Sequence, residues 1–354
     1  LWQKPEGLQA GCQECAPEEF GPPDSWRNSA LKRPVLQVAC LTPIKGWRSY
    51  VQNPTGKRSI VFQHVNGIKS QPVTVPCGRC IGCRLEKSRQ WALRAEKEAS
   101  LYEQNCVVTL TYAKEHLPLN GSIDVVDPVN FMKRLREHFT GTTIRSFGCA
   151  EYGEKHGRPH YHIILFNLDF SDKVQDTSMV SLEPQHKYFT SAILDSLWGM
   201  GKTQIMDCNF ETAAYVARYV TKKFNNKDPQ KIADHYGEKL PERSVCVSRR
   251  PGIGKAWYDL NKQHLYKADL LYSRGVAMQP PQYFNRRYEI DNPEHYAKIK
   301  QYRKAKQNIS NDKIKNQILN RNYTNAARVG HRSRTRAEIT CKEAQFIQLK
   351  RTLE

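Results

Sequence analysis

The chain has 354 residues, enough for one large or two ordinary domains. Its 55 Lys and Arg residues against 35 Asp and Glu give a formal net charge of +20, which favours a polyanionic partner. No apolar run approaches the ~18 residues of a membrane span and no signal peptide is visible, so nucleic acid fits this charge better than a membrane does.

The N-terminal third contains an extension and a cluster of cysteines. Residues 1–38 carry several prolines and offer little core, so we expect a poorly structured extension. Residues 39–105 read as a Cys-rich segment followed by a helix. The eleven cysteines of the chain are mostly scattered, which argues against a disulfide framework and suits a reducing cytoplasm.

The dense cysteine cluster is Cys77, Cys80 and Cys83, with glycines that allow a tight loop. A structural zinc site needs four ligands, and this cluster supplies three. Cys40 is the candidate for the fourth ligand, with His64 in reserve. Buried or reducible thiols without a metal are the alternative interpretation.

Helical and extended patterns alternate from residue 84 to residue 224. We expect Asp127 to cap the second helix and Asn209 to cap the last one. The expected helices cover 84–103, 127–139, 190–198 and 209–224, and the expected strands cover 106–112, 143–151, 158–167 and 203–208. The order strand-helix-strand-strand-helix-strand is the split-βαβ, ferredoxin-like plan, an α+β fold in which helices cover an antiparallel sheet.

The most informative motif is a turn rich in Gly and Pro that leads into His160-Tyr161-His162 and an apolar run. Positions i and i+2 of a strand point to one face, so both imidazoles aim at one point. Glu151 returns a carboxylate across the hairpin, with Glu154 as the alternative. Two imidazoles, one carboxylate and open positions are typical of a catalytic metal site. A lone His-x-His, however, is more often incidental alternation on a strand.

A second motif places Tyr215 and Tyr219 on one face of a helix, one turn apart, with Lys222 three residues further on. Taken alone, the tyrosines could be the polar-tipped edge of a core stripe, because their neighbours are apolar. The two motifs together, in this order and on a basic chain, favour a functional interpretation.

These motifs resemble the HUH endonucleases, and among them the two-tyrosine rolling-circle replication initiators. The similarity is most specific to the initiators of small single-stranded DNA phages, the Microviridae of the gokushovirus type, and runs from about residue 39 to about residue 283. Further segments that carry it are Pro76–Ala92, Thr109–Tyr112, Phe131–Leu135, Ala213–Tyr219 and Ser248–Lys255.

The resemblance implies a nicking domain over residues 106–260 and the roles of its side chains. His160, His162 and Glu151 would hold Mg²⁺ or Mn²⁺, and Tyr215 and Tyr219 would attack the DNA, assisted by Lys222. The products would be a 5′-phosphotyrosine link and a free 3′-hydroxyl that primes a host polymerase, and the strand could later be rejoined. Implied partners are single-stranded or supercoiled phage DNA and a host helicase, in the host bacterial cytoplasm.

Several basic residues are candidates for contacts with the DNA backbone. The glycine-bearing loop that ends at Lys255 lacks the spacing of a phosphate-binding P-loop, so it either contacts DNA or is simply a solvated turn. The basic region 261–354 reads as partly helical or disordered, and it either tracks phosphates or has no defined role. The candidate contacts are Arg218, Lys223, Arg249, Arg250 and Lys255.

A function of a different class would explain the basic charge and the cysteines equally well. The chain would then be a non-catalytic, zinc-containing nucleic-acid-binding protein, and the pairing of the histidine and tyrosine motifs would be a coincidence. Covalent capture of DNA distinguishes the two functions.

Overall fold

The computed structural model describes residues 40–53, 56, 58–153, 156–177, 187–222 and 234–306, and the side chains of 219–222 lie outside the description. The chain divides into two units, Leu1–Val35 and Leu36–Glu354, and every described residue belongs to the second. The extension 1–38, Glu154, Lys223 and the tail beyond residue 306 therefore lie outside the described residues. No helix in the described part of the chain is long and apolar enough to cross a membrane.

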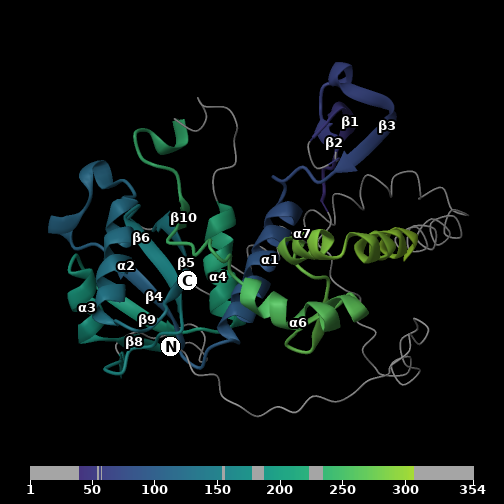
Figure 1. Cartoon of the computed structure of the whole chain (residues 1–354). Helices are drawn as coiled ribbons and strands as arrows, with labels where there is room; N and C mark the ends of the chain where they lie inside the picture. Colours follow the sequence, from purple (N-terminus) through teal and green to yellow (C-terminus); the bar gives the residue numbers. More distant parts are fainter. Residues whose placement is uncertain are drawn as a thin grey trace, which may run out of the picture. The chain divides into compact units, whose positions relative to one another are not determined.

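The main feature is a seven-stranded sheet with the order β10-β5-β6-β4-β9-β8-β7, in which every adjacent pair is antiparallel (Figure 1). Its strands are β4 (Asn105–Thr111), β5 (Arg145–Tyr152), β6 (Pro159–Phe166), β7 (Val174–Gln175), β8 (Tyr188–Thr190), β9 (Thr203–Asp207) and β10 (Arg243–Val245). Since β6 is antiparallel to both β4 and β5, these two strands run parallel with β6 between them. The expected α+β class with an antiparallel sheet is confirmed.

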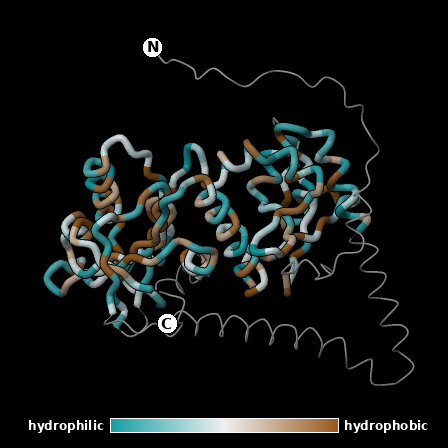
Figure 2. The backbone as a smooth tube through the Cα atoms, turned by 90° about the horizontal axis from the view of Figure 1, so that it is seen from below, coloured by the Kyte–Doolittle hydropathy of each residue, from teal (hydrophilic) through white to brown (hydrophobic). Residues whose placement is uncertain are grey.

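Helices cover both faces of this sheet. On one face, α2 (Val126–His138) and α3 (Ala192–Trp198) bury side chains such as Phe131 and Trp198 against the odd-numbered residues of β6, Ile163 among them. On the other face, α1 (Ile81–Ala99) and α4 (Phe210–Lys222) pack against the even-numbered residues. His160 and His162 are even-numbered, so they share the face that α4 covers. Figure 2 shows the hydrophobic stretches running through the strands.

The ends of two helices test the expected caps. Asn209 caps α4 as expected, because its side-chain oxygen accepts a hydrogen bond from the Thr212 amide at 2.8 Å. The expectation for α2 was wrong: Asp124, not Asp127, accepts hydrogen bonds from the first free amides of the helix. Asp127 lies in the first turn and accepts a hydrogen bond from the Tyr112 hydroxyl at 2.6 Å.

Residues 44–75 form a second, three-stranded antiparallel sheet of order β2-β1-β3, which the sequence did not predict. We call it the N-terminal sheet; it consists of β1 (Ile44–Gln52), β2 (Arg58–Val61) and β3 (Gly67–Val75), with a 3₁₀ turn η2 (His64–Asn66) before β3. Its buried residues are Gly46, Ser49 and Gly67, so this sheet buries no large apolar side chain.

The last described segment forms a third packed core with α1. Its elements are α6 (Lys255–Ala268), β11 (Leu271–Ser273), β12 (Val276–Met278), α7 (Gln282–Asp291) and a helical stretch over residues 293–306. Tyr258, Tyr266 and Phe284 are buried there together with Leu93 of α1. The boundary expected at residue 260 falls within α6. Two further 3₁₀ turns, η3 (Lys114–His116) and η4 (Leu119–Gly121), follow β4.

Candidate active site

The centre of the site is a hairpin that brings two histidines and one glutamate together. In the β5–β6 pair Glu151 lies directly opposite His160, and in the β4–β6 pair Thr109 lies opposite His162. Directly opposed residues on antiparallel strands place their side chains on one face, about 5 Å apart. The period of the strands therefore brings these four side chains to one place, as the sequence analysis expected for the two histidines and Glu151.

The three candidate metal ligands converge on a single carboxylate oxygen. Glu151 Oε1 lies 2.8 Å from His160 Nε2 and 3.0 Å from His162 Nε2. One ligand atom from each of the three residues lies within 4.8 Å of the others. Glu151 is only 3% exposed, and its second oxygen, Oε2, is buried without a hydrogen-bond partner.

The electrostatics of Glu151 favour the charged carboxylate. Burial opposes ionisation, but the hydrogen bonds and charges of His160 and His162 outweigh it, so the pKa of Glu151 lies below its ordinary value. The far nitrogens of both rings are also held: His162 Nδ1 lies 2.9 Å from Thr109 Oγ1, and His160 Nδ1 lies 3.3 Å from the Arg158 carbonyl oxygen. Such partners fix the orientation of an imidazole whose Nε2 binds a metal.

These residues fit a divalent cation. A buried carboxylate oxygen without a partner costs free energy unless something binds it, and a metal ion would satisfy it. Two imidazoles and one carboxylate leave coordination positions open for substrate or water. The donor set suits Mg²⁺, Mn²⁺ and related ions, and the identity of the ion is not fixed by the arrangement.

The tyrosine helix α4 lies beside this cluster. The half-buried ring of Tyr215 meets the ring of His162 edge to face, with 5.2 Å between the centroids. The Arg218 guanidinium carbon lies 5.7 Å from the centre of the Tyr215 ring. Tyr219 and Lys222 follow in the same helix, one and two turns beyond Tyr215, and their side chains are outside the described part of the structure.

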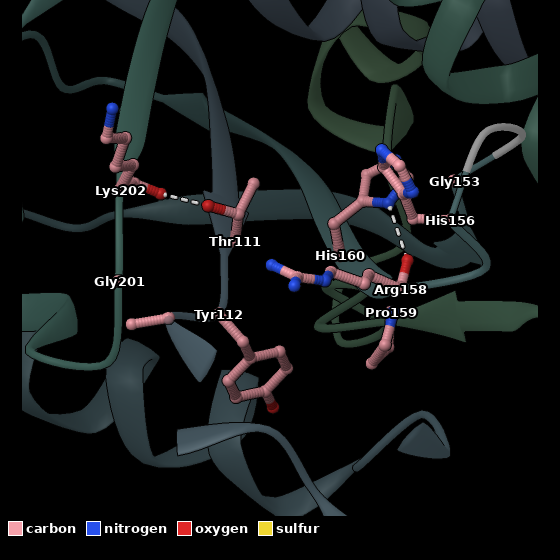
Figure 3. Close-up of a pocket in the computed structure, with 10 residues that line it drawn as sticks. Thr111, Tyr112, Gly153, His156, Arg158, Pro159, His160, Gly201 and Lys202 are labelled. Atoms are coloured by element: carbon pink, nitrogen blue, oxygen red, sulfur yellow. Dashed lines mark hydrogen bonds between the residues drawn. The ribbon is translucent and has the colours of Figure 1, made fainter. Parts of the chain in front are cut away.

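A cleft with a volume of about 610 Å³ adjoins the cluster, and His160 forms part of its wall (Figure 3). Two exposed cations border it, Arg158 and Lys202, and Arg158 extends into the opening between His160 and Thr111. The lining contains no Asp or Glu. The residues that line the cleft are Thr111, Tyr112, Ala113, Gly153, His156, Arg158, Pro159, His160, Gly201 and Lys202.

Sequence analysis missed Arg158 and Lys202, and a glycine signal could have found Lys202. Gly201 crosses the end of β4 at a φ of +156°, where an added Cβ would lie 2.5 Å from the Thr111 carbonyl oxygen. Only glycine permits this close approach. The Lys202 carbonyl in turn accepts hydrogen bonds from the Thr111 amide at 3.0 Å and the Thr111 hydroxyl at 2.8 Å.

The loop expected to contact DNA is anchored from below by a buried ion pair. Glu98, fully buried, pairs with Arg145 and accepts a hydrogen bond from the Gly254 amide at 2.6 Å. Arg249 and Arg250 are exposed on this loop. Lys255, by contrast, opens α6 and forms an ion pair with Asp259 at 2.5 Å, so a DNA phosphate would compete with that carboxylate.

The four cysteines named from the sequence lie together at the base of the N-terminal sheet. One sulfur from each of Cys40, Cys77, Cys80 and Cys83 lies within 4.8 Å of the others. Cys40 precedes β1 and the other three follow β3, so the cluster joins the two ends of the sheet. Cys77 Sγ lies 3.9 Å from Cys83 Sγ, and Cys80 Sγ lies 3.8 Å from Cys40 Sγ.

The surroundings of the sulfurs favour thiolates. Burial raises the pKa of Cys77, but hydrogen bonds from Thr42 and from the amides of Cys80 and Arg79 outweigh it and lower that pKa to about 6. Burial raises the pKa of Cys83. Four sulfurs this close, several of them accepting amide hydrogens, fit a structural tetrahedral cation such as Zn²⁺.

Comparison with known proteins gives a consistent set of relatives. The family model for replication-associated proteins of the ORF2 type matches residues 105–224. Replication-associated protein ORF2 of Spiroplasma virus 4 is 33% identical over 313 residues, which cover 81% of this chain and 92% of that protein. Replication-associated protein VP4 of Bdellovibrio phage phiMH2K is 28% identical over 336 residues, covering 89% and 99%. Replication-associated protein ORF4 of Chlamydia phage 1 is 35% identical over 167 residues, covering 44% and 40%. No solved structure matches the chain.

Proposed function

Because the chain belongs to the replication-associated proteins of small phages of the Microviridae type, we propose that it initiates rolling-circle replication by nicking single-stranded phage DNA. In this proposal it is an HUH endonuclease that uses a tyrosine as nucleophile. The observation that carries the proposal is the convergence of His160 and His162 on Glu151, with the Tyr215 ring beside them.

The topology of the sheet supports this assignment. Within the seven strands, the core order β5-β6-β4-β9 with α2 after β4 and α3 after β6 is that of the split-βαβ, ferredoxin-like plan. HUH enzymes are built on such a sheet, with both histidines on a central strand. Here both histidines lie on β6, between β4 and β5.

The reaction is a transesterification. A phenolate oxygen of Tyr215 or Tyr219 attacks the scissile phosphorus, a bond from phosphorus to the tyrosine forms, and the bond to the 3′ oxygen breaks. The leaving oxygen takes up a proton and becomes a free 3′-hydroxyl, while the 5′ phosphate remains on the tyrosine. A Mg²⁺ or Mn²⁺ ion held by His160, His162 and Glu151 would neutralise charge on the phosphate.

The residues around the tyrosines have separate tasks in this scheme. A free tyrosine has a pKa of about 10, so the phenol needs a nearby cation to ionise at neutral pH. We assign this role to Lys222, in the helix that carries both tyrosines. The second tyrosine would cleave the regenerated origin while the first holds the parental 5′ end. The 3′-hydroxyl would then prime a host polymerase, with a host helicase opening the duplex in the host cytoplasm.

Basic residues near the site are proposed to hold the DNA backbone. Arg158 and Lys202 border the cleft next to His160, where a phosphate next to the scissile one would lie close to both side chains. The candidate contacts from the sequence remain Arg218, Lys223, Arg249, Arg250 and Lys255. Among them the exposed Arg249 and Arg250 are the best placed to reach DNA, because Lys255 is engaged with Asp259.

The Cys40–Cys83 cluster favours one alternative, a zinc-containing nucleic-acid-binding protein without catalysis. A covalent-capture experiment separates the two functions. Labelled single-stranded phage origin DNA is incubated with the protein and Mn²⁺ and resolved on a denaturing gel. The nicking proposal expects a protein band that carries labelled DNA and is lost in the double variant Tyr215→Phe, Tyr219→Phe.

A matched control is Tyr272→Phe, which changes an exposed tyrosine outside the site. This variant should form the covalent band as the unmodified protein does. If the unmodified protein binds the origin strand but never forms the band, the non-catalytic function replaces the nicking proposal.

A further inference from the structure

The segment from Cys40 to Leu85 has an unusual charge. It contains seven Lys and Arg residues and no Asp or Glu. The following 221 residues, 86–306, contain 34 Lys and Arg against 26 Asp and Glu. The net positive charge per residue is therefore about four times as high in the short segment, and no acidic side chain within it offsets its cations.

The charged residues lie on the N-terminal sheet and its cysteine cluster. Lys45 on β1 and Lys69 on β3 are exposed, and neither has a hydrogen bond or ion pair within the described residues. Arg58 has an internal task, because its guanidinium donates to the Ser49 carbonyl at 3.1 Å and so ties β2 to β1. The two lysines, by contrast, are available to a ligand.

Large apolar side chains are also exposed on this sheet and its turns. Fourteen such side chains are exposed in the described part of the chain, and five of them fall between residues 44 and 65. Two of the five are aromatic: Tyr50 is 56% exposed and Phe62 is 57% exposed. Since the sheet buries no large apolar residue, these side chains are not part of a core.

We propose that the N-terminal sheet is a second DNA-binding site, which binds single-stranded DNA separately from the nicking centre. Unpaired nucleic acid offers phosphates to Lys45 and Lys69 and exposed base faces to Tyr50 and Phe62, and this pairing of cations with aromatic rings is how proteins bind single strands without sequence preference. A duplex would satisfy the cations but not the rings, because its bases are stacked.

The site extends the proposed function without depending on it. Nicking leaves a displaced single strand, and a sequence-independent site on the same chain would hold that strand. Binding by the sheet needs neither the His160–His162–Glu151 cluster nor either tyrosine of α4. The two proposals can therefore fail separately.

The test measures binding of fluorescein-labelled oligo(dT) to the full-length chain by anisotropy over a range of salt concentrations. The charge variant is Lys45→Gln, Lys69→Gln, and its control is Lys133→Gln, Lys298→Gln, which removes two exposed lysines elsewhere. Each lost phosphate contact should reduce the slope of log K against log salt by about 0.7. We expect this reduction for the charge variant and little change for the control.

The aromatic variant Tyr50→Ser, Phe62→Ser should weaken oligo(dT) binding by about fivefold or more, with little change in the salt slope. Covalent capture of a short origin strand, which reports on the nicking centre, should be retained by both variants if the fold is intact. If the charge variant loses no more affinity than its control, the proposed site is wrong. A loss confined to duplex DNA, or to vesicles of anionic phospholipid, would equally overturn the single-strand assignment.

Discussion

At the scale of single residues, the orientation of His162 depends on one hydroxyl. Thr109 Oγ1 lies 2.9 Å from His162 Nδ1 and is the polar group that holds the ring from behind. Outer partners of metal-binding histidines typically contribute about 10- to 100-fold to metal affinity, so Thr109→Val should weaken Mn²⁺ binding by roughly that factor. The Mn²⁺ concentration that gives half-maximal covalent capture measures this effect.

The control for this prediction lies two residues further along β4. Thr111→Val removes a hydroxyl that binds the Lys202 carbonyl instead of a histidine. This variant should keep the Mn²⁺ dependence of the unmodified protein, even if it binds DNA less well. Equal shifts of the Mn²⁺ dependence in both variants would mean that the hydroxyl of Thr109 has no specific role.

The three candidate metal ligands were predictable because they follow local rules. Alternation along a strand places His160 and His162 on one face, and a short hairpin returns Glu151 to them. Thr109 was visible only as one of two alternating threonines, since its partner is 53 residues away. Arg158 and Lys202 were not predicted, because the cleft they share forms where β6 approaches the start of β9.

At the scale of elements, one glycine controls how the α3–β9 turn meets the end of β4. An alanine Cβ at Gly201 would lie 2.5 Å from two backbone atoms, the Ala113 nitrogen and the Thr111 oxygen, and backbone cannot move aside as a side chain can. Gly201→Ala should therefore lower the free energy of unfolding by more than about 2 kcal/mol. Urea denaturation measures the change.

Gly275 provides a matched comparison for this substitution. It also has a positive φ, +73°, but an added Cβ there meets no atom within 4 Å. Gly275→Ala should cost about 1 kcal/mol, the conformational penalty alone. If the two variants were equally stable, the close contact at the end of β4 would not be the reason for Gly201.

The strands and helices that frame the site were largely predictable, and those of the N-terminal sheet were not. Strands β4, β5, β6 and β9 are dense in buried apolar residues, so their patterns are strong. The N-terminal sheet is mostly exposed, and shifts of register interrupt both of its strand pairings. A strand without a buried face leaves no alternation in the sequence to detect.

At the scale of the whole molecule, the described chain has three hydrophobic cores, and α1 contributes to two of them. Ala92 and Ala95 pack against the large sheet, while Leu93 packs with Tyr258 and Phe284 of the C-terminal helices. The sequence indicated a helix here, but not that its two faces serve different cores. That division depends on α6 and α7, which lie far along the chain from α1.

The N-terminal sheet has no comparable core, so its stability should depend on the cysteine cluster. No residue before Ile81 belongs to the buried apolar set of the described chain, whereas four sulfurs close the sheet at its base. Small folds that lack a core commonly depend on a structural metal. We expect one zinc per chain by elemental analysis, and we expect Cys77→Ser to abolish it.

The loss of zinc should unfold one region selectively. In Cys77→Ser, amide hydrogen exchange should become fast in residues 44–75 and remain slow in β4, β5 and β6, because the large sheet has its own cores. Cys246→Ser is the control, since that cysteine lies outside the cluster. Protein that contains no zinc, or a Cys77→Ser variant with unchanged exchange in residues 44–75, would show that the four thiols stabilise the sheet without a metal or not at all.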